Sequence, residues 1–349
     1  MAALTDHQAG WAVEGTYGTP VTATKFVPMM ESSKMDWDPM PIQPSGLWVG
    51  APGGVDRADR RFAGIGQGKG SLVVEAASKG QGTLWQAACG TSTSTLVSGS
   101  TYQQVHTPTV TGTVLPSLTF QHGIVDNTGT VNPETFAGVT VTDWVLDIPK
   151  GAGADSSAKF TLNLDAKSLS TVTGLSTFVG PSGASLYSWA GGGIGTTTIT
   201  VGGTLTPPTT NALASVSGGT VNGNFSSITL TSNNNVDTGR WVPGGRNQPT
   251  VGKRSHTVKF DYEYNDNVWR ALQISQGVTS LLIDIPTSES LSTGTARLQV
   301  AFPAIKINSG AFPEPTPGST VITSVEAQVL WDGTNQPFYV VLRTADAAL

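Results

Sequence analysis

The chain has 349 residues and a mass of 36.1 kDa, long enough to bury a large core in one elaborate domain or two smaller ones. Charged residues make up only 12% and the formal net charge is −5, which excludes a basic nucleic-acid-binding protein and charge-driven disorder. The 42 glycines and 21 prolines, among many threonines, serines and valines, are typical of short strands joined by tight turns. We therefore predict an all-β fold.

The start of the chain has no regular pattern. Residues 1–34 mix glycine, threonine, proline and single apolar residues, which predicts an N-terminal arm or an irregular edge strand. The first residues lack the features of an export signal and no apolar run reaches 18 residues, so we expect neither export nor a membrane partner. The single cysteine, Cys89, cannot form an intramolecular disulfide and is interpreted as a small buried apolar residue.

Residues 35–70 are rich in proline and glycine, and they predict one long protruding loop. Their length far exceeds the usual connection of about 4–6 residues, and such loops are usually functional or disordered. Methionine, tryptophan and arginine are enriched at protein interfaces, so this loop is predicted to contact another protein surface. The candidate contact residues are Met35, Trp37, Met40, Trp48, Arg57, Arg60 and Arg61. The alternative is that the tryptophans fold back onto their own domain.

Alternating patterns predict strands through the rest of the chain. The clearest is at residues 255–264, where an apolar face from His256 to Tyr264 lies opposite a polar face that includes Lys259, Asp261 and Glu263. The other predicted strands are at residues 71–77, 117–124, 139–148, 159–165, 196–201, 226–232, 280–286, 297–307, 320–331 and 338–343.

Two segments predict short flanking helices, and two predict surface structure. One helix lies around residues 79–89. The other is capped by Asp266 and ended by Gly277 as its C′ residue. Residues 180–223 predict expanded surface loops around one strand, and residues 332–349 a C-terminal strand and arm.

No pattern predicts enzyme chemistry. The four histidines show no metal-binding spacing, and no nucleophile elbow occurs. The glycine run at residues 64–70 precedes a strand, whereas a phosphate-binding loop must open a helix. We therefore predict no catalytic, cofactor-binding or metal-binding residues. A triad assembled from distant residues stays open.

Several motifs together resemble one family. The segment Glu14-Gly-Thr-Tyr-Gly-Thr-Pro-Val-Thr-Ala-Thr-Lys-Phe-Val-Pro28 is similar to the opening E-x-x-Y-G-T-P-V-x-P-T-x-F-x-P of the major tail proteins, or tail tube proteins, of long-tailed non-contractile bacteriophages. Ala23 stands where the family often has a second proline. Further similar segments are residues 31–35, 60–61, 68–89, 136–144, 227–236 and 251–261, so the resemblance covers nearly the whole chain.

The resemblance implies a structural role for a single domain spanning residues 1–349. Members of the family form an antiparallel β-sandwich or barrel with a flanking helix, and six copies assemble into a ring around a channel. Stacked rings form the tube through which viral DNA leaves, and residues 35–70 correspond to the loop between rings. The implied partners are other copies of the chain, the tape measure protein, and terminator and distal tail proteins at the tube ends. Double-stranded DNA would pass without specific binding. The implied location is the virion, after assembly in the host cytoplasm.

The charge pattern suggests which residues line such a channel. DNA carries one phosphate charge per about 1.7 Å of its axis, so inward lysines would slow its passage. Asp261 and Glu263, on the polar face of their strand, are therefore candidate lumen-lining residues; alternatively this face lies outside the tube. The competing function is a surface adhesin or carbohydrate-binding module, but such a protein is expected to carry an export signal or a wall anchor.

Overall fold

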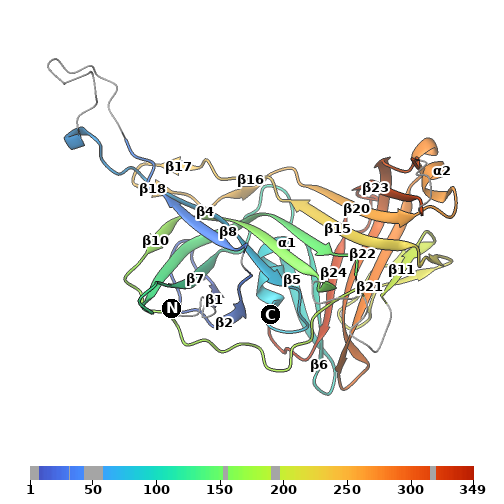
Figure 1. The fold of residues 1–349 in the computed structure, drawn as a ribbon, viewed down its shortest axis with the longest axis horizontal. Coiled ribbons are helices and arrows are strands. Elements are labelled where there is room, and N and C mark those ends of the chain that lie inside the picture. The colour runs from blue at the N-terminus through green and yellow to red at the C-terminus, as the bar shows by residue number, and fades with distance from the viewer. Residues whose placement is uncertain (1–7, 31, 43–57, 152–155, 190–196, 315–319) are drawn as a thin grey trace, which may run out of the picture.

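The protein is described from a computed structural model that covers residues 8–30, 32–42, 58–151, 156–189, 197–314 and 320–349. Antiparallel strands dominate it, with two α-helices in this part of the chain, and the predicted all-β fold is confirmed. The strands form an elongated molecule, with residues 58–66 near one end and the second helix at the other (Figure 1).

The first half of the chain contributes these elements: β1 (Gln8–Val13), β2 (Lys25–Pro28), β3 (Lys34–Asp38), the 3-10 helix η2 (Ala58–Arg60), β4 (Gln67–Glu75), α1 (Gly82–Cys89), β5 (Gly90–Ser98), β6 (Thr101–Pro108), β7 (Leu118–Val125), β8 (Val131–Ile148), β9 (Lys159–Ala166) and β10 (Ser168–Ser170).

The second half contributes β11 (Thr198–Val201), β12 (Thr204–Thr206), β13 (Ser215–Ser217), β14 (Thr220–Val221), β15 (Phe225–Asn233), β16 (Val236–Asp237), β17 (Trp241–Val242), β18 (Gly245–Arg246), β19 (Thr250–Val251), β20 (Ser255–Glu263), α2 (Val268–Ser275), β21 (Thr279–Ser290), β22 (Thr295–Ser309), β23 (Ile322–Val329) and β24 (Tyr339–Thr344).

Two sheets make the main layers. The long sheet has the order β3-β4-β9-β8-β15-β20-β23, and the back sheet has the order β14-β11-β21-β22-β24-β6-β5. The C-terminal part of β22 also pairs with β23, which joins the two sheets at one side. The N-terminal half of β8 pairs with β7 and β10. β7 also pairs with β1, and β1 pairs with β2. The long strand β8 therefore links the long sheet to this smaller one.

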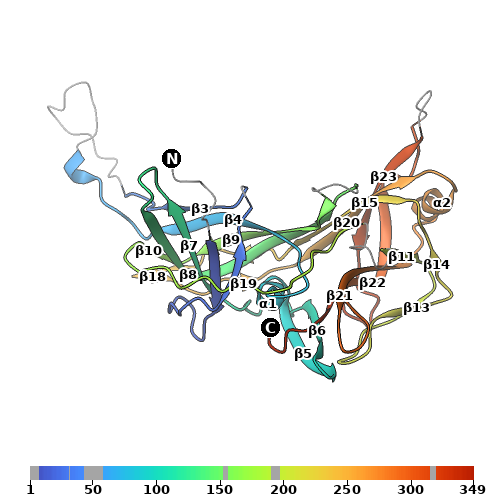
Figure 2. The same cartoon turned by 60° about the horizontal axis from the view of Figure 1, so that its bottom comes forward.

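An aromatic core fills the space between the layers. α1 contacts β5, β6 and β8, and lies between the long sheet and the β5–β6 hairpin (Figure 2). Its Trp85 is 1% exposed, stacks on Phe160 with ring centroids 3.9 Å apart, and meets Trp144 edge-on at 5.5 Å. Cys89 ends this helix and is buried, as its interpretation from the sequence required. Large aromatic side chains supply the packing that a chain rich in small residues otherwise lacks.

The second helix follows the predicted pattern with small differences at both ends. Its N-cap residue is Asn267, one residue after the predicted Asp266. The backbone N–H of Val268 donates to the Asp266 carboxylate at 3.0 Å, and Trp269 packs on Phe260 and Phe225. The left-handed residue at its C-terminus is Gln276, with φ of 52°, so Gly277 does not take that conformation. Gln276 is the C-cap of the helix, so Gly277 stands at the predicted C′ position and only the left-handed conformation falls one residue earlier.

Four segments correct the predictions. Residues 8–28 contain β1 and β2, and the fully buried Trp11 shows that they are no free arm. Residues 35–38 belong to β3 and residues 67–70 to β4, so the connecting loop is shorter than 35–70. The hairpin β5–β6 was not predicted, because its threonines, serines and buried glutamines show little contrast in polarity.

The fourth segment is the predicted loop at residues 180–223, which contains four short strands where one was expected. Leu205 and Ala214 pack on Leu282 and Ala301 of the back sheet. Gln103 of β6 donates from its amide to the backbone oxygens of Thr209 and Ala212, both at 2.8 Å. This segment therefore extends the back sheet through β11 and β14, and its Leu205 and Ala214 cover part of the sheet's outer face. At the other terminus, residues 345–349 lie beside α1 and β5 rather than forming an arm.

Candidate assembly surfaces

The first motif of the chain is a buried structural anchor. Glu14 is 8% exposed, and its carboxylate accepts hydrogen bonds from two backbone N–H groups and two hydroxyls. The donors are Gly18 at 2.8 Å, Ser117 at 2.8 Å, Thr119 at 3.0 Å and Gly138 at 2.8 Å. Four donors offset the cost of burying a charge. The motif therefore joins β1 to β7 and β8.

The glycine run before β4 permits close packing against β3. A Cβ atom at Gly66 would overlap the indole of Trp37, and one at Gly70 would overlap the backbone of Lys34 and Met35. The close approach of β3 therefore requires glycine at these two positions. This agrees with the interpretation of the glycine run as the entry to a strand, which is β4.

One face of the long sheet is polar and open. Residues directly opposite each other on antiparallel strands share a face, and one row crosses six strands of this sheet. The row runs from β4 to β23 through Glu75, Lys159, Asp147, Thr229, Lys259 and Glu326. Its charges alternate in sign, except at Thr229. Each lysine in the row therefore has a carboxylate opposite it on a neighbouring strand.

Two of the remaining acids of this face, Asp261 and Asp143, have hydroxyl or amide partners. Asp261 accepts hydrogen bonds from Ser227 of β15 at 2.8 Å and Ser324 of β23 at 2.5 Å. Asp143 accepts one from Thr142 at 2.9 Å, and Glu263 is exposed. On β8, β9, β15, β20 and β23, the face presents five carboxylates, Asp143, Asp147, Asp261, Glu263 and Glu326, against two lysines, Lys159 and Lys259. We call the solvent-facing surface of these five strands the acidic face. Both predicted lining residues lie on it.

The predicted contact residues in the loop divide into two groups. Met35 is 7% exposed and belongs to the chain's own core, so including it among the contacts was wrong. Trp37 also packs partly against that core, as the alternative interpretation held. Met40, Arg60 and Arg61 lie in the connection between β3 and β4, with Arg60 at the end of η2. Trp48 and Arg57 lie outside the described residues.

The base of the loop is an ordered stem, which we define as residues 39–42 and 62–66. Ile42 and Phe62 form a β-bridge with backbone hydrogen bonds of 2.9 and 3.2 Å, and the N–H of Gly64 donates to Pro39 at 3.2 Å. Four of its apolar side chains are exposed, namely Met40 (40%), Ile42 (50%), Phe62 (56%) and Ile65 (41%). Clustered apolar exposure of this kind marks a protein contact surface.

A buried ion pair fixes one edge of the acidic face. Arg246 contacts the carboxylate of Asp165, and both side chains are almost fully buried. Gln67 donates to the other carboxylate oxygen at 2.5 Å. Burial raises the pKa of Asp165, while the charge of Arg246 and the amide of Gln67 lower it. The pair ties the β17–β18 hairpin to β9 and β4, and no local pattern in the sequence predicts it.

Two serine–histidine pairs lie in the core. Ser92 contacts Nδ1 of His106 at 2.6 Å, and Ser232 contacts Nδ1 of His256 at 2.8 Å. Burial lowers the pKa of His106 to about 3; burial, then the charge of Arg254, lowers that of His256 to about 4. Since both imidazoles are at most 5% exposed, a substrate in solvent cannot reach them. His256 thus packs on the apolar face of its strand, as predicted.

The described residues contain no cluster of three or more histidine, cysteine or acidic side chains that could hold a metal ion. In the same part of the chain, no helix is long and apolar enough to cross a membrane. The distinctive features are surfaces: an open acidic face and an exposed stem. These features are typical of β-rich structural proteins rather than of enzymes with a ligand-binding cleft.

Comparison with known families identifies the chain more closely. The family model described as phage tail tube protein matches residues 5–333. This chain therefore belongs to the phage tail tube protein family, and it is a structural protein of the virion tail. A search of curated proteins finds no match.

Proposed function

We propose that this chain forms hexameric rings that stack into the tail tube of a long-tailed, non-contractile phage, with a channel that conducts DNA during ejection. Its role is structural rather than catalytic. Copies of itself are the main partners, with the tape measure protein and the terminator and distal tail proteins at the tube ends. Assembly takes place in the host cytoplasm.

The acidic face is the observation that carries this proposal. A channel wall for DNA must not hold phosphates, and this face has an excess of three negative charges. Lys159 lies opposite Glu75 and Asp147, and Lys259 lies opposite Glu326, so their charges are balanced locally. Hydroxyl donors fix the carboxylate of Asp261. The face is therefore suited to line the lumen.

Negative-stain electron microscopy of the purified protein tests the proposal directly. We expect rings with six-fold symmetry and tubes built from them. A protein that stays monomeric over a wide range of concentration and ionic strength would contradict it.

Removing part of the loop tests its role between rings. Deletion of residues 39–54 should leave a folded β-protein, because β3 and β4 lie outside the deletion and carry the core contacts. Circular dichroism should be unchanged, while long tubes should be absent from micrographs. Tubes of normal length would contradict a role of the loop in stacking.

Charge reversal on the acidic face tests the lumen. The double variant Asp261→Lys and Glu263→Lys should still form rings and tubes, but these tubes should retain double-stranded DNA at low salt and release it at high salt. The control reverses Asp126 and Glu314, which are exposed, lie outside these strands and give the same change in net charge. If the test variant disturbs assembly and leaves DNA retention unchanged, the two acids lie in a subunit interface.

A further inference from the structure

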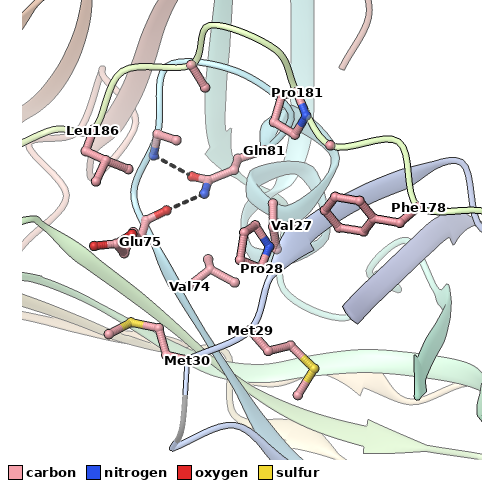
Figure 3. Close-up of a pocket in the computed structure, with 13 residues that line it drawn as sticks. Val27, Pro28, Met29, Met30, Val74, Glu75, Gln81, Phe178, Pro181 and Leu186 are labelled. Atoms are coloured by element: carbon pink, nitrogen blue, oxygen red, sulfur yellow. Dashed lines mark hydrogen bonds between the residues drawn. The ribbon is translucent and has the colours of Figure 1, made fainter. Parts of the chain in front are cut away.

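An apolar groove lies beside the β3–β4 hairpin. Its volume is about 670 Å³, and its lining includes Met29, Met30, Phe178, Pro181 and Leu186 (Figure 3). The amide of Gln81 donates to the backbone oxygen of Glu75 at 2.5 Å and accepts from the N–H of Ala77 at 3.1 Å. Because these backbone groups already form hydrogen bonds within the chain, the lining of the groove favours an apolar occupant over a polar ligand.

The groove and the stem lie at opposite ends of the same hairpin. Met29 and Met30 precede β3, Val74 and Glu75 end β4, and Ala77 follows it, so the open end of the hairpin forms part of the groove. The stem extends from the other end, between Asp38 and Gln67. At about 3.3 Å per residue, the nine residues of β4 separate them by about 30 Å. One copy can therefore offer its stem to the groove of a second copy displaced along the hairpin.

The two surfaces also match in chemistry. The stem exposes the apolar side chains of Ile42 and Phe62, and the exposed Arg61 adjoins them. The groove offers apolar walls and the carboxylate of Glu75, which accepts a hydrogen bond from the hydroxyl of Ser157 at 2.7 Å and lies on the strand position opposite Lys159. An apolar contact flanked by one charge pair is a typical arrangement for a specific interface.

We propose that the stem of each copy inserts into this groove of a copy in the next ring. The inference rests on the proposed function and names the receiving surface for the loop. The contact is heterologous, since stem and groove are different patches of one chain. Repeated along one direction, such a contact does not close, so it builds an open stack of rings.

Two complementary variants test this assignment. Phe62→Asp places a charge on the stem, and Ala184→Trp fills the groove, which Ala184 lines. Each variant should form rings but no tubes. When preformed rings of the two variants are mixed, the intact stems of one should enter the intact grooves of the other, giving stacks of two rings and nothing longer. Normal tubes from either variant alone, or no paired rings in the mixture, would overturn the proposal.

Matched controls separate a local effect from general damage. Val110→Asp changes another strongly exposed apolar residue, and Ser182→Trp adds the same bulk at an exposed position on the same segment as Ala184. Both should form tubes of normal length. If the unmodified protein itself forms no tubes, the proposed function fails; if it forms tubes and only the stem and groove variants behave unexpectedly, this inference alone fails.

Disulfide trapping identifies the occupant of the groove. Tubes of the variant with Phe62→Cys and Leu186→Cys should form chains of covalently linked subunits on oxidation. The competing occupant is the chain's own N-terminal segment, because Gln8 pairs with Pro28 at the groove. A disulfide within one chain of the variant with Leu4→Cys and Leu186→Cys, without links between subunits in the first variant, would overturn the proposal.

Discussion

Acidification from pH 7.5 to pH 5.0 is expected to lower the free energy of unfolding of the subunit by about 4 kcal/mol. The pKa values of His106 and His256 are about 3 and about 4 in the folded chain, against 6.5 for a free imidazole. The unfolded chain therefore binds more protons between these values, and stability falls as the pH drops below 6.5. At pH 5.0 each histidine contributes about 2 kcal/mol, since one pKa unit equals about 1.4 kcal/mol.

Urea denaturation, followed by tryptophan fluorescence at both pH values, measures this loss. His106→Gln and His256→Gln should each remove about half of the pH dependence, and the double variant should remove most of it, whatever their effect on stability at pH 7.5. An unchanged pH dependence in the double variant would show that other groups are responsible.

Glu14→Ala is expected to destabilise the subunit by about 3 kcal/mol. Four donors, from Gly18, Ser117, Thr119 and Gly138, would lose their acceptor in a buried place, and bonds to a charged group contribute about 1.5–3 kcal/mol each when isolated. The effects are not additive, because water can enter the site and satisfy some of the donors. The result should be a urea midpoint lower by roughly 1 M, at an m-value of about 3 kcal/mol/M.

Two further variants define the cause. Glu263→Ala removes an exposed carboxylate and should change stability by less than about 0.5 kcal/mol. Glu14→Gln keeps the shape but turns an amide N–H₂ toward donors, so it should fall between the alanine variant and the parent. A loss as small as that of Glu263→Ala in the Glu14→Ala variant would contradict the anchoring role.

Strong alternation made much of the fold predictable. Residues 255–264 were predicted correctly in both position and facing, because every second residue of β20 is apolar and buried. The β5–β6 hairpin escaped prediction because its buried side chains include the polar Gln103, Gln104 and His106. The two glutamines bond to distant backbone oxygens, and His106 contacts Ser92 on the facing strand. Alternation of apolar and polar residues predicts a strand only when its buried face is apolar. Where the buried face is itself polar, as in this hairpin, the strand goes undetected.

The candidate surfaces were predictable only in part. Asp261 and Glu263 could be placed on the polar side of one strand, but the charge row from Glu75 to Glu326 depends on the register of six strands. Met35 has the composition of an interface residue, yet it lies on β3 opposite Gly70 and faces the core. The motif that begins at Glu14 can be identified in the sequence by its resemblance to the family. Its structural role, a carboxylate that accepts hydrogen bonds from three segments of the chain, is visible only in the fold.

Because Cys89 is the single cysteine and is buried, the rate at which its thiol reacts with a reagent measures how often the core of the unmodified chain opens. The thiol is 1% exposed, and burial raises its pKa to about 12, so a thiol reagent meets neither an accessible nor an ionised sulfur. Its backbone oxygen also accepts from Arg254 at 3.1 Å and from Thr109 at 3.0 Å, which holds the end of α1 in place. Labelling then proceeds only through transient opening around α1, at a rate set by the opening equilibrium. Comparing that rate in single subunits and in assemblies measures how much the assembly restrains each subunit's interior.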